Sequence, residues 1–140
     1  MNIESIIEDL QQKGCRTTSL RMALLEILLK KQEPISAQNL MKELSARGFT
    51  PNETTVYRQL DTLVKHKVVD LVVLNPKVQL FEIVHEHHHH FVCEGCDDVQ
   101  DVHSESIESA FHSFEEELAR KGLSIQKHEL TFFGECQSCH

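Results

Sequence analysis

The sequence predicts an α+β fold in two domains, and three observations lead to this prediction. Four segments with helical periodicity precede two strand-like runs in the first part of the chain. Two C-x2-C pairs lie in the remainder. The charge also changes along the chain: residues 1–84 carry 11 Lys and Arg against 10 Asp and Glu, whereas residues 85–140 carry 3 against 12. We therefore expect one domain over residues 1–84 and a second over residues 85–140.

Helical periodicity fills most of the first domain. Apolar residues recur at helical spacing from Ile3, and Gly14 ends this first helix. Thr17, Thr18 and Ser19 can cap the second helix, and Ser36 can cap the third, after Pro34 has broken the chain. We expect helices over residues 3–13, 37–47 and 53–66, and a further helix that runs from the cap at residues 17–19 to about residue 31. Their inward residues should include Met22, Leu25, Ile27, Leu28, Leu29, Leu40, Met41, Leu44, Val56, Leu60, Leu63 and Val64.

Two strand-like runs, residues 68–74 and 78–84, are joined by Asn75-Pro76-Lys77 and so predict a β-hairpin. The second, third and fourth helices and the hairpin make a winged helix-turn-helix domain, and the first helix is an N-terminal addition. In such a domain the last helix enters the major groove of DNA and the hairpin is the wing. The alternative for each charged residue is a solvated helix face. The residues expected to contact DNA are Arg16, Arg21, Thr55, Tyr57, Arg58, Lys65 and Lys77.

The second domain is expected to be a small sheet with one long amphipathic helix. Strands are predicted over residues 88–92 and 99–102, a helix over 105–121, and one or two further strands within 123–133. The helix has an apolar stripe of Ile107, Ala110, Phe111, Phe114 and Leu118. Such a small α/β domain is too thin to bury a core alone. We therefore expect it to be a dimerisation domain, and a two-fold protein reads a palindromic operator.

A run of histidines opens this domain, with five of the ten histidines between residues 85 and 90. Its apolar flanks predict a strand, on which successive side chains point to opposite faces. His88 and His90 then share one face, and His87 and His89 share the other, so the run can serve two metals. From His85 the run also matches H-E-x-x-H, but that zinc-protease motif needs a helix, which a strand does not supply.

The two C-x2-C pairs are Cys93 with Cys96 and Cys136 with Cys139. Their spacing fits a closed, tetrahedral, structural zinc site. A disulfide or a thioredoxin-type redox pair is the alternative, but two pairs beside a histidine cluster favour zinc. Cys15 is the odd cysteine and is expected to be a small buried residue. No signal-like or membrane-spanning apolar run is present, so we expect a cytoplasmic protein with reduced thiols.

Together these residues resemble the ferric uptake regulator family of bacterial metal-sensing repressors, across essentially the whole chain. The matching stretches are Gly14-x3-Thr18-x2-Arg21, Ile35-Ser36-Ala37-x2-Leu40, Thr54-Thr55-Val56-Tyr57-Arg58-x-Leu60, Phe81-Glu82, residues 87–96 and Cys136-x2-Cys139. The resemblance implies a homodimeric repressor, not an enzyme, that binds double-stranded operator DNA when a regulatory metal is bound. It implies neither a membrane nor a small-molecule substrate as partner, and it implies structural zinc on the four cysteines.

The resemblance also implies up to two further metal sites. One lies within the dimerisation domain and maps onto His87, His89, Glu108 and His128. The other lies at the hinge between the domains and maps onto Glu82, His88 and His90, completed by Asp70 or Asp101. The hinge site is the natural sensor, because a metal there fixes the angle between the two recognition helices.

The regulatory metal is expected to be zinc, iron or manganese, and we favour zinc. Iron-type and peroxide-sensing members have a histidine where this chain has Pro34. Zinc-type members use an acidic residue after the recognition helix, which Asp70 can supply, although they usually have Cys in place of Glu82. Histidine-rich sites suit zinc, and carboxylates favour iron or manganese. Two other classes are a metalloenzyme, which needs an open coordination position, and a zinc-buffering or interaction module, which would show no salt-dependent DNA binding.

Overall fold

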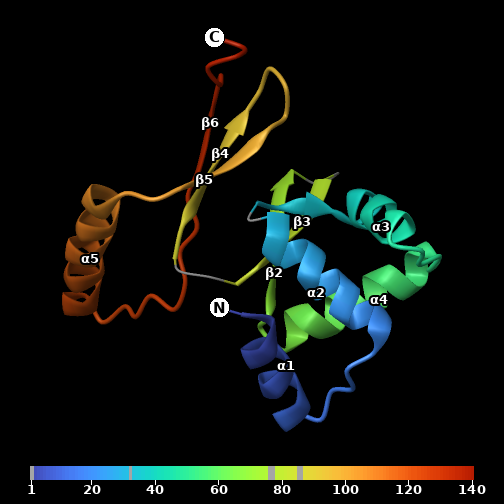
Figure 1. Ribbon diagram of the computed structural model, residues 1–140. Coiled ribbons are helices and arrows are strands. Elements are labelled where there is room, and N and C mark those ends of the chain that lie inside the picture. The colour runs from blue at the N-terminus through green and yellow to red at the C-terminus, as the bar shows by residue number, and fades with distance from the viewer. Residues whose placement is uncertain (1, 32, 76–77, 85–86) are drawn as a thin grey trace. The chain divides into compact units, whose positions relative to one another are not determined.

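The computed structural model describes residues 2–31, 33–75, 78–84 and 87–140. The chain divides into two compact units, Met1–Glu86 and His87–His140, and each is described by itself. The predicted α+β class is confirmed: the first unit combines four helices with an antiparallel sheet, and the second combines a sheet with one helix (Figure 1).

The first unit is a winged helix-turn-helix. It contains α1 (Ile3–Gln12), α2 (Ser19–Lys31), β1 (Ile35–Ser36), α3 (Ala37–Ala46), α4 (Glu53–Lys65), β2 (Val69–Asn75) and β3 (Val78–Ile83). The sheet has the order β1-β3-β2 with antiparallel pairing throughout. β1 was not predicted, because two residues are too few to show a strand's alternation. Pro76 and Lys77, in the predicted turn, lie outside the described residues, and with them the DNA contact predicted for Lys77.

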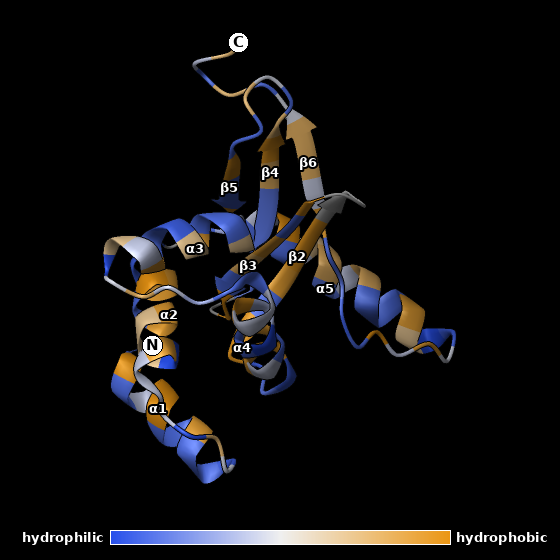
Figure 2. Ribbon diagram, turned by 90° about the vertical axis from the view of Figure 1, so that its right-hand side faces the viewer, coloured by the Kyte–Doolittle hydropathy of each residue, from blue (hydrophilic) through white to orange (hydrophobic). Residues whose placement is uncertain are grey.

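α2 is the centre of the first unit's core. Its residues Ala23, Leu24, Leu25, Ile27 and Leu28 are all buried, and Figure 2 shows the helix hydrophobic along most of its length. The prediction for this helix was incomplete, because it omitted the buried residues Ala23 and Leu24. Leu29 is partly buried and packs against the core, and Met22 is partly buried. A helix packed on several sides has no single apolar stripe, so periodicity cannot choose its inward face. Leu40, Leu44, Val56, Leu60, Leu63 and Phe81 complete the core, with Cys15, Met41 and Val64 packed against it.

Side-chain caps set where the helices begin. Asn52 Oδ1 accepts a hydrogen bond from the Thr55 N–H at 2.8 Å at the start of α4. Ser36 Oγ accepts from the Asn39 N–H at 3.2 Å at the start of α3. These caps satisfy backbone donors that have no partner within the helix. The cap at Asn52 places Thr55, Tyr57 and Arg58 in the first two turns of α4, whereas Lys65 is its last residue.

The second unit is a three-stranded sheet with one helix. β4 (His89–Cys93) lies between β5 (Val99–Val102), which is antiparallel to it, and β6 (Thr131–Gly134), which is parallel. α5 (Glu105–Arg120) begins after Ser104, whose Oγ accepts from the Ile107 N–H at 3.4 Å. No residue of α5 is buried in the single chain, and Phe114 of its predicted stripe is 47% exposed.

The strands predicted within residues 123–133 are shorter than expected. Only β6 forms, and residues 123–130 have no regular structure. The Leu130 carbonyl accepts from the His90 N–H at 3.3 Å, so the pairing with β4 begins just before β6.

Candidate metal sites and DNA-binding helix

Side chains of the metal-binding types gather at three places in the second unit. The first group is Cys93, Cys96, Cys136 and Cys139. The second is His87, His89, Glu108 and His128. The third is His88 and His90 with Asp101. In the second unit, the residues that the sequence predicts as metal ligands therefore lie together in the same three groups that were predicted.

The four cysteine sulfurs fit a single tetrahedral ion. All four Sγ atoms lie within 4.8 Å of one another, and Cys96 Sγ is 3.8 Å from Cys136 Sγ. Four thiolates around zinc at about 2.3 Å stand about 3.8 Å apart, so this donor set has the size that zinc requires. Each knuckle is closed by its own turn: the Asp97 N–H donates to the Cys93 carbonyl, and the Cys139 N–H donates to that of Cys136.

The thiols of this group influence one another's protonation. The Cys136 N–H donates to Cys93 Sγ at 3.3 Å, and this is the largest cause that lowers the pKa of Cys93 to about 6. Hydrogen bonds with the neighbouring thiols, first that of Cys136, raise the pKa of Cys139 to about 12. Four thiolates this close repel one another. A divalent cation supplies the positive charge that allows all four to ionise.

Gly95 allows the two knuckles to approach. A Cβ at this position would lie 2.8 Å from Cys139 Cβ and 3.0 Å from Cys139 Sγ. This role of Gly95, between Cys93 and Cys96, was not predicted from the sequence. A glycine inside a C-x2-C knuckle was the available signal, because glycine is used where another segment comes close.

The second group joins β4, α5 and the segment that precedes β6. His87 Nε2 lies 2.8 Å from His128 Nε2, and His89 Nε2 lies 2.7 Å from Glu108 Oε1. His89 is 1% exposed, and its Nδ1 makes no hydrogen bond with the described residues. Burial is the largest cause that lowers the pKa of His87, which favours the neutral imidazole that metal binding needs. Three imidazole nitrogens and a carboxylate oxygen suit a divalent transition metal.

The third group uses the opposite side of the histidine run. His88 Nε2 lies 3.2 Å from His90 Nε2, and Asp101 Oδ1 lies 3.8 Å and 3.6 Å from these two nitrogens. His90 and Asp101 are directly opposite one another in the β4–β5 ladder. Within this unit, Asp101 is therefore the carboxylate beside both imidazoles. Asp70 and Glu82 are opposite residues on β2 and β3 of the first unit, where Glu82 is buried and Asp70 is exposed.

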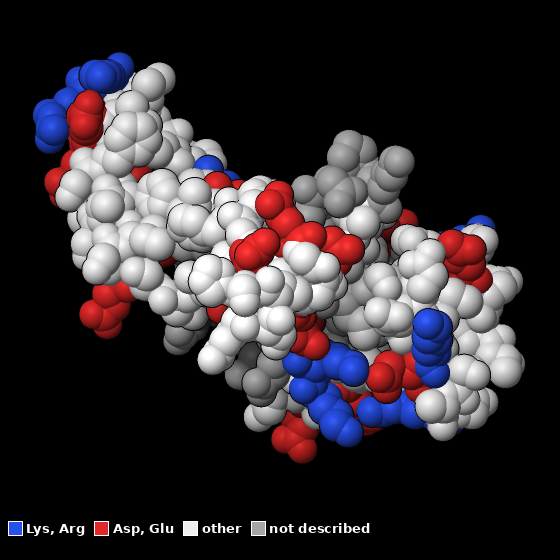
Figure 3. All heavy atoms as spheres, turned by 90° about the horizontal axis from the view of Figure 1, so that it is seen from above, with Lys and Arg blue, Asp and Glu red and all other residues white. Residues whose placement is uncertain are grey.

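Most of the residues predicted to contact DNA offer polar groups at the surface of the first unit. Arg16, Arg58 and Lys65 are exposed, and Thr55 is partly exposed. Tyr57 is half-buried and packs edge-on against Phe81, with ring centroids 6.3 Å apart. Figure 3 shows Lys and Arg side chains interspersed with Asp and Glu on the face it presents. A DNA surface on this protein depends on local clusters rather than on net charge.

Arg21 differs from the other predicted DNA contacts. It is 9% exposed, its Nε donates to Gln59 Oε1 at 2.9 Å, and its Nη1 donates to the Arg16 carbonyl at 2.8 Å. It thereby links α2 both to α4 and to the segment before α2. This internal role was not predicted, because an arginine in a helix gives the same sequence pattern whether it faces solvent or another element.

The family-model comparison decides the assignment: the model of the ferric uptake regulator family matches residues 12–133. The chain belongs to the ferric uptake regulator family. The matched proteins of this family are regulators of transcription and not enzymes. Among the described residues, no helix combines the length and apolar content that crossing a membrane requires.

Three members of the ferric uptake regulator family are similar to this chain along most of its length. The peroxide operon regulator of Bacillus subtilis is 27% identical over 139 residues, covering 98% of this chain and 92% of its own length. The zinc uptake regulation protein of Mycobacterium tuberculosis is 33% identical over 128 residues, covering 90% and 95%. The structure of the ferric uptake regulator from Francisella tularensis with iron matches with a TM-score of 0.76 at 26% identity, covering 90% of this chain and 95% of that one. The names of these three relatives thus refer to peroxide, zinc and iron, respectively.

Proposed function

We propose that this protein is a homodimeric, metal-dependent repressor that binds a palindromic operator in the cytoplasm and controls metal-uptake or homeostasis genes. Residues 1–84 form the DNA-binding domain, and residues 85–140 form the metal-binding and dimerisation domain. The observation that carries the proposal is the grouping of His88, His90 and Asp101 at the start of the second unit. These ligands follow the winged helix directly in the chain, so a metal bound to them is well placed to influence it.

In this proposal each group of ligands has its own role. The four cysteines hold structural zinc, because their donor set is closed and matches tetrahedral sulfur spacing. His88, His90 and Asp101, together with Glu82 of the first unit, hold the regulatory metal at the hinge. Asp70 is the alternative carboxylate. His87, His89, Glu108 and His128 hold a further metal within the dimerisation domain.

Dimerisation is supported by the apolar side chains that the second unit leaves exposed. Phe114 is 47%, Leu123 is 56% and Phe133 is 57% exposed. Burying such residues against a second copy removes apolar surface from water at about 25 cal/mol per Å². A unit with an unburied helix gains its core in this way.

We favour zinc as the regulatory metal. A zinc site would take Asp70 as its carboxylate beside His88 and His90, and a four-coordinate set rich in imidazole suits zinc. The relative with 33% identity is a zinc uptake regulation protein. Pro34 stands where iron-type and peroxide-sensing members have a histidine.

Iron or manganese is the second candidate, and the position of Asp101 favours it. Asp101 Oδ1 lies within 4 Å of Nε2 of both His88 and His90. With Glu82 it would make a site with as many carboxylates as imidazoles. Such sets shift preference away from zinc and toward ferrous or manganous ions.

The test begins with protein stripped of exchangeable metal and with palindromic duplexes selected from a randomised pool by metal-loaded protein. Binding is followed by fluorescence anisotropy during titration with zinc, ferrous and manganous ions in buffered, anaerobic solution. We expect zinc to restore binding at buffered concentrations well below micromolar. Restoration by iron or manganese alone establishes the second candidate. Equal binding with and without every metal overturns metal-dependent repression.

Three variants make this titration specific. His90→Ala and Asp101→Asn should abolish the metal dependence while the zinc of the four cysteines remains. The matched control is His112→Ala. His112 is an exposed histidine of α5 whose Nε2 lies 3.4 Å from Glu116 Oε1, and it belongs to none of the three ligand groups. Converting Tyr57 and Arg58 together to Ala should abolish DNA binding without changing the zinc content.

A further inference from the structure

We propose that Glu115 of α5 is a positioning residue for the His87, His89, Glu108 and His128 site, and that it acts by holding the imidazole of His128. This inference rests on the proposed function, because it presumes that this site binds a metal. Glu115 belongs to none of the three groups of ligands.

The two ring nitrogens of His128 face different partners. Its Nε2 lies 2.8 Å from His87 Nε2, at the centre of the ligand group. Its Nδ1 lies 3.8 Å from Glu115 Oε1, at the edge of the group. The ring is therefore placed between the other ligands on one side and a carboxylate on the other.

One face of α5 supplies the support for this ring. Glu108, Phe111 and Glu115 are spaced at i, i+3 and i+7, so they lie along one side of the helix. The Phe111 ring stacks on that of His128, with centroids 4.3 Å apart and planes 23° apart. Phe111 also lies 5.8 Å from the ring of His89. Stacking fixes the plane of the His128 ring, and the carboxylate selects which nitrogen points toward it.

The chemistry of imidazole explains why this selection matters. A neutral imidazole carries its proton on one nitrogen, and only the other nitrogen has a lone pair for a metal. The carboxylate of Glu115 lies 3.8 Å from Nδ1, beyond hydrogen-bond distance, so it is the negative charge that favours the tautomer protonated at Nδ1. That tautomer leaves Nε2, which faces His87, free to bind a metal. Metal-binding histidines are commonly oriented in this way by a carboxylate, and losing it typically lowers metal affinity about 10- to 100-fold.

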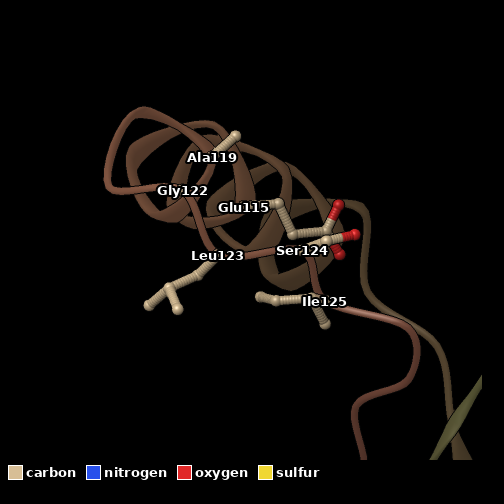
Figure 4. Close-up of a pocket in the computed structure, with 6 residues that line it drawn as sticks. All are labelled: Glu115, Ala119, Gly122, Leu123, Ser124 and Ile125. Atoms are coloured by element: carbon tan, nitrogen blue, oxygen red, sulfur yellow. The ribbon is translucent and has the colours of Figure 1, made fainter.

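Glu115 lines a pocket, so its side chain can be replaced without disturbing a packed core. The pocket has a volume of about 460 Å³ and lies between α5 and the chain that follows it (Figure 4). Glu115 and Ala119 line one wall, and Gly122 to Ile125 line the other. In Figure 4 the Glu115 side chain extends toward Ser124 and Ile125, on the segment that continues to His128. Its side chain is 42% exposed, so replacing it removes no core packing.

The experiment compares Glu115→Ala with Glu115→Gln, whose amide oxygen keeps a partial negative charge near Nδ1. The matched control is Glu116→Ala, because Glu116 is 61% exposed and pairs with His112 instead. The tautomer of His128 is read from long-range ¹⁵N–¹H correlations in the protein without exchangeable metal. Affinity at the site is measured with cobaltous ion as the probe, by its absorption and by competition with zinc.

We expect His128 to be protonated at Nδ1 in the unchanged protein and in the control. Glu115→Ala should shift it toward the Nε2-protonated tautomer and weaken cobalt binding about 10- to 100-fold. Glu115→Gln should restore part of both. An unchanged tautomer and unchanged affinity in Glu115→Ala overturn the inference.

His87→Ala separates this inference from the proposed function. If the unchanged protein binds no more cobalt than His87→Ala, the proposed metal site fails. The tautomer of His128 still shows in that case whether Glu115 holds the ring. If His87→Ala loses one cobalt and Glu115→Ala behaves like Glu116→Ala, the metal site stands and the role of Glu115 is wrong.

Discussion

Consecutive residues in this chain serve separate groups of ligands because a strand alternates its side chains. His87 and His89 reach His128 and Glu108, whereas His88 and His90 reach each other and Asp101. A helix would have spread the same residues around its axis. His89 and His90 lie in β4, and His87 and His88 continue the same alternation just before it, so a short run supplies candidate ligands to two groups.

Gly95 gives the first prediction at the scale of a single residue. Gly95→Ala places a methyl group 2.8 Å from Cys139 Cβ, so the second knuckle must shift and its sulfur must leave the tetrahedral arrangement. Forcing an extra carbon into a packed site typically costs about 1–3 kcal/mol. We expect the free energy of unfolding of the zinc-loaded protein to fall by that amount in chemical denaturation, and zinc to pass more readily to a chromogenic chelator.

The control for this prediction is Glu94→Ala, in the same knuckle, where the side chain is exposed. It should leave both the unfolding free energy and the rate of zinc transfer unchanged. If Gly95→Ala holds zinc as firmly as Glu94→Ala does, the close approach of the two knuckles is not what zinc binding requires.

At the scale of elements, Arg21 connects α2 with α4 from inside the first unit. Arg21→Met removes the donors to Gln59 Oε1 and to the Arg16 carbonyl. Leaving such acceptors unpaired costs about 1–3 kcal/mol, so we expect the unfolding free energy to fall by that amount. DNA affinity should weaken because α4 loses a support, but the dependence of affinity on salt should keep its slope.

Arg16→Ala is the matched comparison, because Arg16 is exposed. If Arg16 contacts a phosphate, this variant should leave stability unchanged and reduce the slope of log K against log salt by about 0.9. The opposite result, in which Arg21→Met reduces the slope without loss of stability, would show that Arg21 contacts DNA directly.

The sequence predicted elements well where one face of an element is buried within its own unit. α1, α3 and α4 follow their apolar periodicity and stop within a residue of the predicted ends. It was less accurate where a helix is buried on several sides, as in α2, and over residues 123–130, where alternation did not lead to a strand. The groupings of ligands followed from strand alternation and from family resemblance. Glu115 and Gly95 were missed because their roles depend on approaches between segments distant in sequence.

At the scale of the whole molecule, the two kinds of metal site should fail in different ways. Structural zinc supplies on the order of 10 kcal/mol in small zinc-finger peptides, comparable with the whole stability of a typical domain. Cys93→Ser removes a fully buried thiol from the proposed zinc site, so we expect loss of zinc, a lower unfolding temperature and dissociation of the dimer. His90→Ala removes a ligand from the proposed regulatory site, so we expect a folded dimer whose DNA binding no longer responds to metal.

Thermal unfolding, sedimentation velocity and DNA binding on the same samples distinguish these outcomes. The difference follows from where each metal contributes its free energy. The cysteine site joins two distant segments of one unit, so its loss is a loss of folding. The histidine site is proposed to add free energy only to the arrangement that binds DNA, so its loss changes a population of folded states. A Cys93→Ser protein that remains a stable dimer and loses only its response to metal would reverse the two roles.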